Sequence, residues 1–283
     1  MTVYVFTGPT ISPAEAACEL EAIYLPPVAE GDVYRAALKR PRAIGIIDGY
    51  FQSIAPVRHK EILWAMSKGI HVFGSASIGA LRAAELAPFG MQGVGSIYKW
   101  YREGILEDDD EVAIAHAPAE AGFRPISEAM VNIRQTLSKA QHCGIISKQL
   151  RKKLEDLAKN LFYPDRNYQV LLRSARDSGA CHTELAYLER WLPKGRVNQK
   201  RDDAVAMLQT IRQRLARGLK RKTVSYFFEH TAAWELARTH AGAFVRSTKV
   251  PDGPAPSLAR DSQNDEQSRK EDRDGREALI SGK

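Results

Sequence analysis

The stretch IHVFGSASIGALRAAEL, residues 70–86, decides the fold. It begins with a short apolar run, Ile70–Gly74, turns on small residues, and continues as an alanine-rich stretch from Ile78 to Leu86. A buried strand followed at once by a helix is the repeating unit of a parallel sheet covered by helices. Residues 70–86 therefore predict one βα unit of such a sheet.

The sequence before and after this unit repeats the same alternation. Residues 43–48 (AIGIID) are almost wholly apolar, as a central parallel strand buried on both faces should be. A helix is predicted over Ser12–Leu20 with Ser12 as its N-cap, and another starts at Pro56. The remaining predicted strands are Val3–Gly8, Ala22–Leu25 and Gly93–Ile97. We predict an α/β fold, a Rossmann-like parallel sheet of about five strands flanked by helices.

The second half of the chain has a different pattern, made of helices with basic faces. Residues 111–116 (EVAIAH) fit either one more strand or the start of this helical layer. The predicted organisation is an α/β core that carries the site (1–124), a basic helical region packed on the core (125–246) and a disordered tail (247–283). The predicted helices of the helical part are 127–141, 147–160, 167–176, 184–191, 201–215 and 224–238.

Composition limits the class of protein. The chain has 283 residues, 44% of them hydrophobic, but no apolar run near the ~20 residues of a membrane span. Its start does not resemble a signal peptide, so we expect a cytoplasmic protein without a membrane partner. Cys18, Cys143 and Cys181 are an odd number without CxxC spacing, which argues against disulfides and thiolate metal sites. We predict that these thiols are buried.

The net charge of +7 is concentrated in one segment, because residues 134–222 hold 21 Lys and Arg against 8 Asp and Glu. A basic surface of this kind binds an acidic protein or a nucleic acid, or it is simply solvated. The aromatic pattern of RNA-recognition motifs and the spacing of zinc fingers are both absent, so a nucleic acid is the least favoured partner.

Ligands of an open parallel sheet bind outside the carboxyl ends of its strands, where the loops converge. Four stretches follow predicted strands in this way. They are Gly8–Thr10, Pro26–Glu30, Asp48–Phe51 and Gly74–Gly79.

The stretch Gly74–Gly79 (GSASIG) resembles a nucleophile elbow, with a serine on a sharp turn between strand and helix. The match is partial, since Ser75 occupies the first glycine position of G-x-S-x-G. If Ser77 is the nucleophile, the helix that begins at Ile78 offers its N-terminus to an oxyanion. The alternatives are that small residues let strand and helix pack closely, or that Ser77 caps the helix. The stretch lacks the features of a P-loop or a GxGxxG motif, so we expect no nucleotide cofactor.

A serine nucleophile needs a base that is itself oriented. His59 follows the third strand on the same edge as Asp48, and His116 reaches the site if residues 111–116 form a strand. Arg82 and Glu85 either pair on the helix surface or anchor a carboxylate substrate through Arg82. The predicted catalytic residues are Ser77, His59 and Asp48, and the predicted substrate-binding residues are Gly8, Pro9, Thr10, Gly49, Tyr50, Ser75, Ala76, Ile78, Gly79 and Arg82.

The acidic run Asp108–Glu111 could ligate Mg²⁺ or Ca²⁺, but consecutive residues point in different directions. A solvated loop or a helix N-terminus fits it better. We therefore expect no metal site.

Several motifs together resemble the TfuA-like core domain family. They are VFTGPT (5–10), DGYF (48–51), the run from Val57 to Leu86, FGMQGVG (89–95) and DDDEVAIAH (108–116), and the resemblance extends over about residues 1–215. Proteins of this family are implied partners of YcaO enzymes, which use ATP to activate a backbone amide. The pair installs thioamides in peptides or proteins, with the ATP chemistry in the YcaO enzyme.

The resemblance implies a role in sulfur supply or in activation of the YcaO partner. Combined with the serine turn, it leads to the hypothesis that Ser77 and His59 hydrolyse the C-terminal thiocarboxylate of a ThiS-like sulfur carrier and release sulfide. The alternative is a non-catalytic adaptor or allosteric activator that recruits a sulfur donor. A hydrolase of small esters and a cysteine persulfide relay are less favoured, the latter because no cysteine lies on the chosen edge of the sheet.

Overall fold

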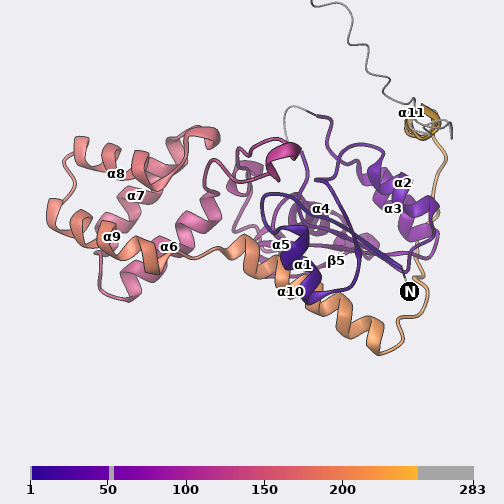
Figure 1. Ribbon diagram of the computed structural model, residues 1–283, viewed down its shortest axis with the longest axis horizontal. Coiled ribbons are helices and arrows are strands. Elements are labelled where there is room, and N and C mark those ends of the chain that lie inside the picture. Colours follow the sequence, from indigo (N-terminus) through magenta and orange to yellow (C-terminus); the bar gives the residue numbers. More distant parts are fainter. Residues whose placement is uncertain (1, 51–53, 248–283) are drawn as a thin grey trace, which may run out of the picture. The chain divides into compact units, whose positions relative to one another are not determined.

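The computed structural model describes residues 2–50 and 54–247, and for residues 242–247 only the backbone. Five parallel strands form one sheet in the order β2-β1-β3-β4-β5 (Figure 1). This is one of the common doubly wound orders, and its direction reverses between β1 and β3. The strands are β1 Val3–Phe6, β2 Ile23–Leu25, β3 Ala43–Ile46, β4 His71–Gly74 and β5 Gln92–Gly93. The predicted α/β fold with about five parallel strands is confirmed.

Helices cover both faces of the sheet. Alternate residues of a strand point to opposite faces, so Ile44 and Ile46 pack under α2 (Asp32–Leu38), α3 (His59–Ser67) and α4 (Ile78–Leu86). The other face carries α1 (Pro13–Glu19) and α10 (Gln199–Ala216). Their buried side chains there are Ala16, Leu20, Ala204, Met207, Leu208 and Ile211.

Helix α10 reaches the sheet from far along the chain. A Cβ added to Gly45 on β3 would lie 3.1 Å from the terminal carbon of Met207, so the helix lies directly on the central strand. Figure 1 shows α10, in orange, running from the helical part of the chain along the sheet. Its N-terminal end thereby lies at the carboxyl edge of the strands, where Lys200 enters the site described below.

Four helices form a second core. They are α6 Met130–His142, α7 Lys148–Asn160, α8 Tyr168–Asp177 and α9 His182–Gly195, and they pack around Leu137, Leu154, Leu172 and Leu188. Contacts join residues 1–246 into one unit. The division into a core (1–124) and a helical region (125–246) stays a prediction. The predicted disordered tail lies outside the described residues apart from Ser247.

The structure corrects three secondary-structure predictions. The predicted strand Gly93–Ile97 is wrong beyond Gly93, because α5 (Ser96–Arg102) begins there. The carboxylate of Asp203 on α10 accepts hydrogen bonds from the N–H groups of Ser96 (3.0 Å) and Ile97 (2.7 Å), and this distant cap starts the helix.

Residues 111–116 are neither a strand nor the start of a helix. Glu111 ends the short 3-10 helix η2 (Asp109–Glu111), and residues 112–116 continue as irregular chain, with one antiparallel bridge between His116 and Pro125. The helix predicted over 224–238 begins at Ala232 and is α11 (Ala232–Ser247). The remaining short helices are η1 Ala87–Phe89, η3 Ala119–Ala121 and η4 Tyr163–Asp165.

The prediction of buried thiols is also wrong, because Cys18, Cys143 and Cys181 are all exposed. Each lies in or beside a helix on the surface rather than in either core. Among the described residues, no helix is long and apolar enough to cross a bilayer.

Candidate functional site

Two loops meet where the strand order reverses, at the carboxyl ends of β1 and β3. Asp48 follows β3 and is 1% exposed. Its carboxylate accepts two hydrogen bonds from Thr10 after β1, one from the backbone N–H (3.0 Å) and one from the hydroxyl (2.5 Å). Asp48 therefore ties the two loops together.

A cavity of about 250 Å³ opens beside these loops. We call it the Ser77 cavity. It brings together five of the predicted site residues with side chains from later parts of the chain. Its lining residues are Pro9, Asp48, Gly49, Tyr50, Ser77, Ile114, Ala115, His116, Tyr163 and Lys200.

Ser77 stands at the N-cap position of α4 and is 3% exposed. Its hydroxyl makes no capping hydrogen bond, and it has no hydrogen-bond partner among the described residues. The strained residue of the turn is Ala76, with φ 66°, a left-handed conformation that is uncommon outside glycine. An elbow would carry its nucleophile at that strained position. Ser77 thus follows the strained residue, and it differs from an elbow serine in this respect.

The small residues of the turn also serve packing. A Cβ on Gly79 would lie 1.8 Å from the Ile46 carbonyl oxygen, and one on Gly74 would lie 2.0 Å from the Gly79 carbonyl oxygen. The buried hydroxyl of Ser75 donates to the Asp203 carbonyl oxygen (2.8 Å). Close packing of strand and helix therefore accounts for Gly74, Ser75 and Gly79, and it leaves Ser77 without a structural partner.

The predicted base His59 does not line the Ser77 cavity. It starts α3 on the surface, where its Nε2 lies 2.7 Å from Glu85. Arg82 pairs with the same carboxylate (2.7 Å) and donates to the Val57 carbonyl oxygen (3.2 Å). The predicted surface pair of Arg82 and Glu85 is confirmed.

His116 lines the cavity and is already oriented. Its Nδ1 lies 2.9 Å from the Ala117 carbonyl oxygen, which can only accept a hydrogen bond. In the neutral ring Nδ1 therefore carries the proton, and the lone pair is on Nε2. The rings of Tyr50 and Phe123 lie near the imidazole, with centroids 6.1 and 5.7 Å from its own. A histidine held in this way can accept a proton from a hydroxyl.

Lys200 is a buried cation in the wall of the site. The side chain is 3% exposed, and its ammonium donates to the Val112 carbonyl oxygen (2.8 Å). Burial lowers the pKa of Lys200, and the nearby carboxylates of Asp48 and Glu128 act in the opposite direction. An ammonium in this position attracts an anionic group that enters the cavity.

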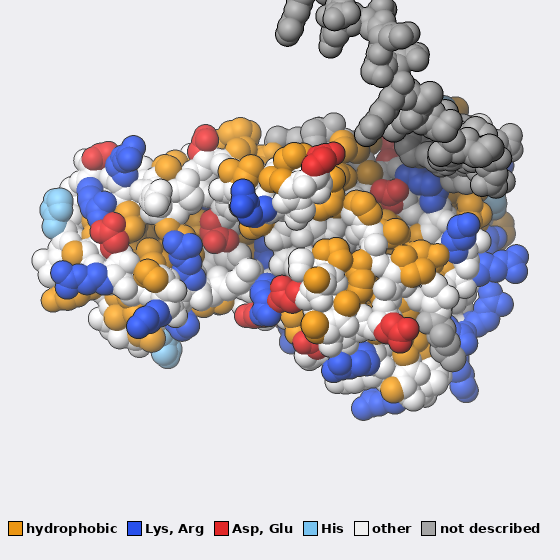
Figure 2. All heavy atoms as spheres, in the orientation of Figure 1, with side chains coloured by type: hydrophobic (Ala, Val, Ile, Leu, Met, Phe, Trp, Pro, Cys, Tyr) orange, Lys and Arg blue, Asp and Glu red, His pale blue; other side chains and the backbone are white. Residues whose placement is uncertain are grey.

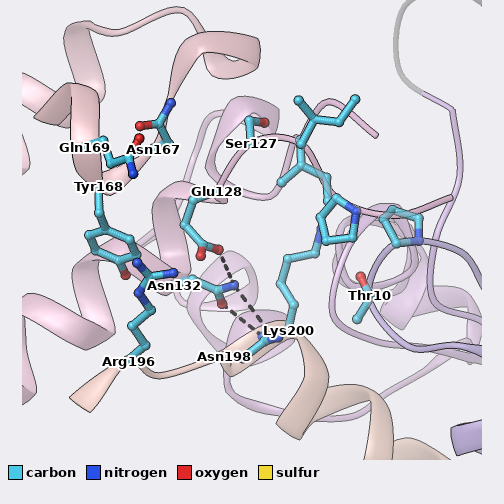
Figure 3. Close-up of a pocket in the computed structure, with 14 residues that line it drawn as sticks. Thr10, Ser127, Glu128, Asn132, Asn167, Tyr168, Gln169, Arg196, Asn198 and Lys200 are labelled. Carbon is cyan, nitrogen blue, oxygen red and sulfur yellow. Dashed lines mark hydrogen bonds between the residues drawn. The ribbon is translucent and has the colours of Figure 1, made fainter. Parts of the chain in front are cut away.

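A second cavity, of about 470 Å³, shares Pro9, Ile114 and Lys200 with the first. We call it the Arg196 cavity, and Figure 3 shows its lining side chains. Asn132 is a central contact in it, because its amide donates to Glu128 (2.8 Å) and Asn198 (3.2 Å) and accepts from the Lys200 N–H (3.2 Å). The remaining lining residues are Thr10, Pro125, Ile126, Ser127, Asn167, Tyr168, Gln169 and Arg196.

The acidic run Asp108–Glu111 lies outside both cavities and is neutralised by side chains from the helical part. Lys159 contacts Asp108 (3.0 Å), Asp110 and Glu111 (3.0 Å). Among the described residues, no group of three or more His, Cys, Asp or Glu could hold a metal ion.

Sequence reasoning did not single out Lys200 or Arg196, and it preferred His59 to His116 as the candidate base. Asp48 and Lys200 are 152 positions apart, and no local pattern marks their contact. The signal that could have found Lys200 is its place just after Asn198, whose side chain caps α10 by accepting from Arg201 N–H (3.1 Å). A helix that begins near a sheet edge delivers its first residues to that edge.

Residues 48–167 match the family model described as TfuA-like protein. This match confirms the resemblance to the TfuA-like family over that segment of the chain. No curated protein matches the chain. The TfuA-like segment includes Asp48, Ser77 and His116, whereas Arg196 and Lys200 follow it in the sequence. The two cavities are therefore lined by residues from inside and outside the matched segment.

Proposed function

We propose that this TfuA-like protein supplies sulfide to a YcaO enzyme during backbone thioamidation. The sulfide comes from hydrolysis of the C-terminal thiocarboxylate of a ThiS-like sulfur carrier in the Ser77 cavity. The observation that carries the proposal is a buried serine hydroxyl without a partner, in one cavity with an oriented histidine and a buried lysine.

The chemistry proceeds in two steps. The Ser77 Oγ attacks the carbonyl carbon of the thiocarboxylate, the C–S bond breaks, and hydrogensulfide leaves while an ester forms between the carrier and Ser77. Water then hydrolyses the ester, which frees the carrier as a carboxylate and restores the hydroxyl. The net reaction consumes one water and needs no oxidant or reductant.

Each proton and charge has a candidate group. His116 Nε2 takes the Ser77 proton and gives it to the departing sulfur, which leaves as hydrogensulfide. It then takes a proton from the attacking water and returns it to Ser77 Oγ as the ester breaks. This role moves from His59 because His59 lies outside the cavity wall. Lys200 offsets the negative charge of the thiocarboxylate. The N–H of Ile78, which follows Ser77 and has no backbone acceptor among the described residues, stabilises the oxyanion.

The test measures sulfide released from a purified thiocarboxylated carrier by the parent chain and by Ser77→Ala. Loss of the nucleophile should lower the rate by about three orders of magnitude or more. Carrier affinity and the circular dichroism spectrum should stay at the parent values, because the Ser77 hydroxyl makes no hydrogen bond within the described residues that its removal would break.

Two outcomes would contradict this function. If Ser77→Ala is folded and releases sulfide at the parent rate, the serine mechanism is wrong. If the parent binds the carrier and releases no sulfide, yet thioamidation by the YcaO enzyme still requires the chain, the protein is an adaptor or activator.

A further inference from the structure

The Arg196 cavity adjoins the proposed reaction site but is lined by neither Ser77 nor His116. It shares Pro9, Ile114 and Lys200 with the Ser77 cavity, so a bound chain can pass from one to the other along Lys200. The Ser77 cavity, at about 250 Å³, has room for a terminal thiocarboxylate and little of the chain that precedes it. An extended chain advances about 3.3 Å per residue, so the preceding residues must lie in the neighbouring cavity or outside.

Arg196 is an exposed residue that lines this cavity, and its guanidinium has no acidic partner among the described residues. It stacks over the ring of Tyr168 at 4.6 Å from the centroid. Tyr168 is itself fixed, since it is 5% exposed and its hydroxyl donates to Thr136 (2.8 Å). Among the described residues, the guanidinium has no ion pair or hydrogen bond, although 17 ion pairs join other side chains. A stacked arginine with free donors is suited to carbonyl and carboxylate oxygens.

The other polar groups of the cavity include both the donors and the acceptors that a peptide backbone needs. In Figure 3 Glu128, Asn132 and Arg196 approach one another at the centre of the cavity. Glu128 uses Oε1 for Ala129 and Asn132, and Oε2 has no partner among the described residues. Asn198 uses only its carbonyl oxygen. A free carboxylate oxygen can accept from peptide N–H groups, and the amide and guanidinium can donate to peptide carbonyls.

We propose, resting on the function proposed above, that the Arg196 cavity binds the last residues of the carrier in an extended conformation. Arg196 and Asn198 donate to peptide carbonyl oxygens, and Glu128 accepts from a peptide N–H. The apolar walls at Pro9, Ile114 and Ile126 contact the chain between these groups. The terminal thiocarboxylate then reaches Lys200 and Ser77. Arg196 therefore determines substrate specificity, because it contacts the peptide chain of a protein terminus, which a small thioacid lacks.

The experiment compares two substrates in the full chain. Thioacetate occupies the Ser77 cavity alone, whereas the thiocarboxylated carrier needs both cavities. The measured quantity is the ratio of kcat/KM for the carrier to kcat/KM for thioacetate. Arg196→Ala should lower this ratio about 10- to 100-fold, mainly through the KM for the carrier, as expected for loss of a charged hydrogen bond. Arg196→Lys keeps the charge without the planar fork and should give an intermediate ratio.

The matched control is Arg190→Ala. Arg190 is an exposed arginine of α9, six positions before Arg196, and it lines neither cavity. It should leave the ratio at the parent value. An Arg196→Ala ratio equal to that of Arg190→Ala would overturn the assignment of the cavity.

A binding measurement separates this inference from the proposed function. A labelled peptide that copies the last six residues of the carrier, ending in an ordinary carboxylate, is titrated by fluorescence anisotropy. If no substrate yields sulfide but the peptide binds the parent and not Arg196→Ala, the hydrolase proposal fails and the peptide site stands. If sulfide is released and the peptide binds both chains equally, the hydrolase stands and the peptide site is wrong.

Discussion

At the scale of single residues, Lys200 joins the two cavities and has an unusual position for a lysine. An ammonium that is 3% exposed is tolerated only when it is hydrogen-bonded and has opposite charge nearby. The Val112 carbonyl oxygen supplies the hydrogen bond, and Asp48 and Glu128 supply the charge. Thr10 holds the Asp48 carboxylate in place through two hydrogen bonds, so this charge stays fixed beside the lysine.

The choice between the two histidines is testable at this scale. His116→Ala should lower sulfide release about 10²- to 10⁴-fold, the usual contribution of a general base. His59→Ala should lower it less than about threefold, because it removes only an exposed pair with Glu85. Sulfide assays on both variants, with carrier binding as the control for folding, decide between them. If only His59→Ala strongly lowered the rate of sulfide release, His59 would be the general base and the assignment to His116 would be wrong.

At the scale of elements, the acidic run after α5 fastens the helical part of the chain to the sheet part. Arg166 is fully buried, and its guanidinium donates to Asp110 (2.8 Å) and to the carbonyl oxygens of Ala158 (3.1 Å) and Leu161 (3.2 Å). Arg134 on α6 makes a two-pronged contact with Glu111, with both distances at 2.9 Å. This cluster fixes the segment that carries Ile114 and His116 into the Ser77 cavity.

Asp110→Asn tests that fastening. It leaves the buried Arg166 cation without its carboxylate, so the free energy of unfolding at pH 7 should fall by about 2 kcal/mol. Denaturant unfolding gives this value. The matched change Asp109→Asn, at an exposed neighbour without an ion pair among the described residues, should stay within about 0.5 kcal/mol of the parent.

The loss of stability caused by Asp110→Asn should depend on pH. Burial acts to raise the pKa of Asp110, but hydrogen bonds and charges from Lys159 and Arg166 outweigh it and lower the pKa. A carboxyl group whose pKa is lower in the folded than in the unfolded chain stabilises the fold fully at pH values above its unfolded pKa. This contribution is lost progressively as the pH falls below that value. The difference between parent and Asp110→Asn should therefore be constant from pH 7 to 5 and shrink below about pH 4. A difference that grew on acidification would contradict the ion pair.

At the scale of the whole molecule, positive charge is spread rather than gathered at the site. Figure 2 shows Lys and Arg side chains over both ends of the view. Part of the basic segment is neutralised within the fold, since Arg134, Lys159, Arg166 and Arg176 all pair with carboxylates. The exposed lysines of α7, which include Lys152, carry no such partner among the described residues.

An acidic carrier that docks on this surface should bind in a salt-dependent way. Raising the salt concentration from about 50 to about 500 mM should weaken the binding constant roughly tenfold, because exposed charges are screened beyond a Debye length of a few ångströms. Lys152→Glu should weaken binding at low salt and flatten this dependence. Affinity that is the same at both salt concentrations would exclude the basic surface from docking.

Local sequence pattern is enough to predict the central strands of the sheet and the edge at which the candidate site lies. Residues 43–46 are apolar without alternation, so the central strand and its burial on both faces follow from local pattern. The N-cap of α1 is likewise local, since Ser12 accepts from Glu15 N–H (3.2 Å) three positions later. The edge follows because parallel strands all end on one side, which brings Asp48 and Ser77 together.

The side chains that complete the two cavities come together through tertiary packing, which local sequence pattern does not reveal. Helix α10 packs beside α1 after the chain has left the sheet for about a hundred residues, and so Lys200 reaches a loop 152 positions earlier. The same packing lets Asp203 start α5, where the sequence indicates a strand. Periodicity records which face of an element is apolar and not which other element covers it. The identity of the base and the role of Arg196 therefore depend on packing that no local pattern contains.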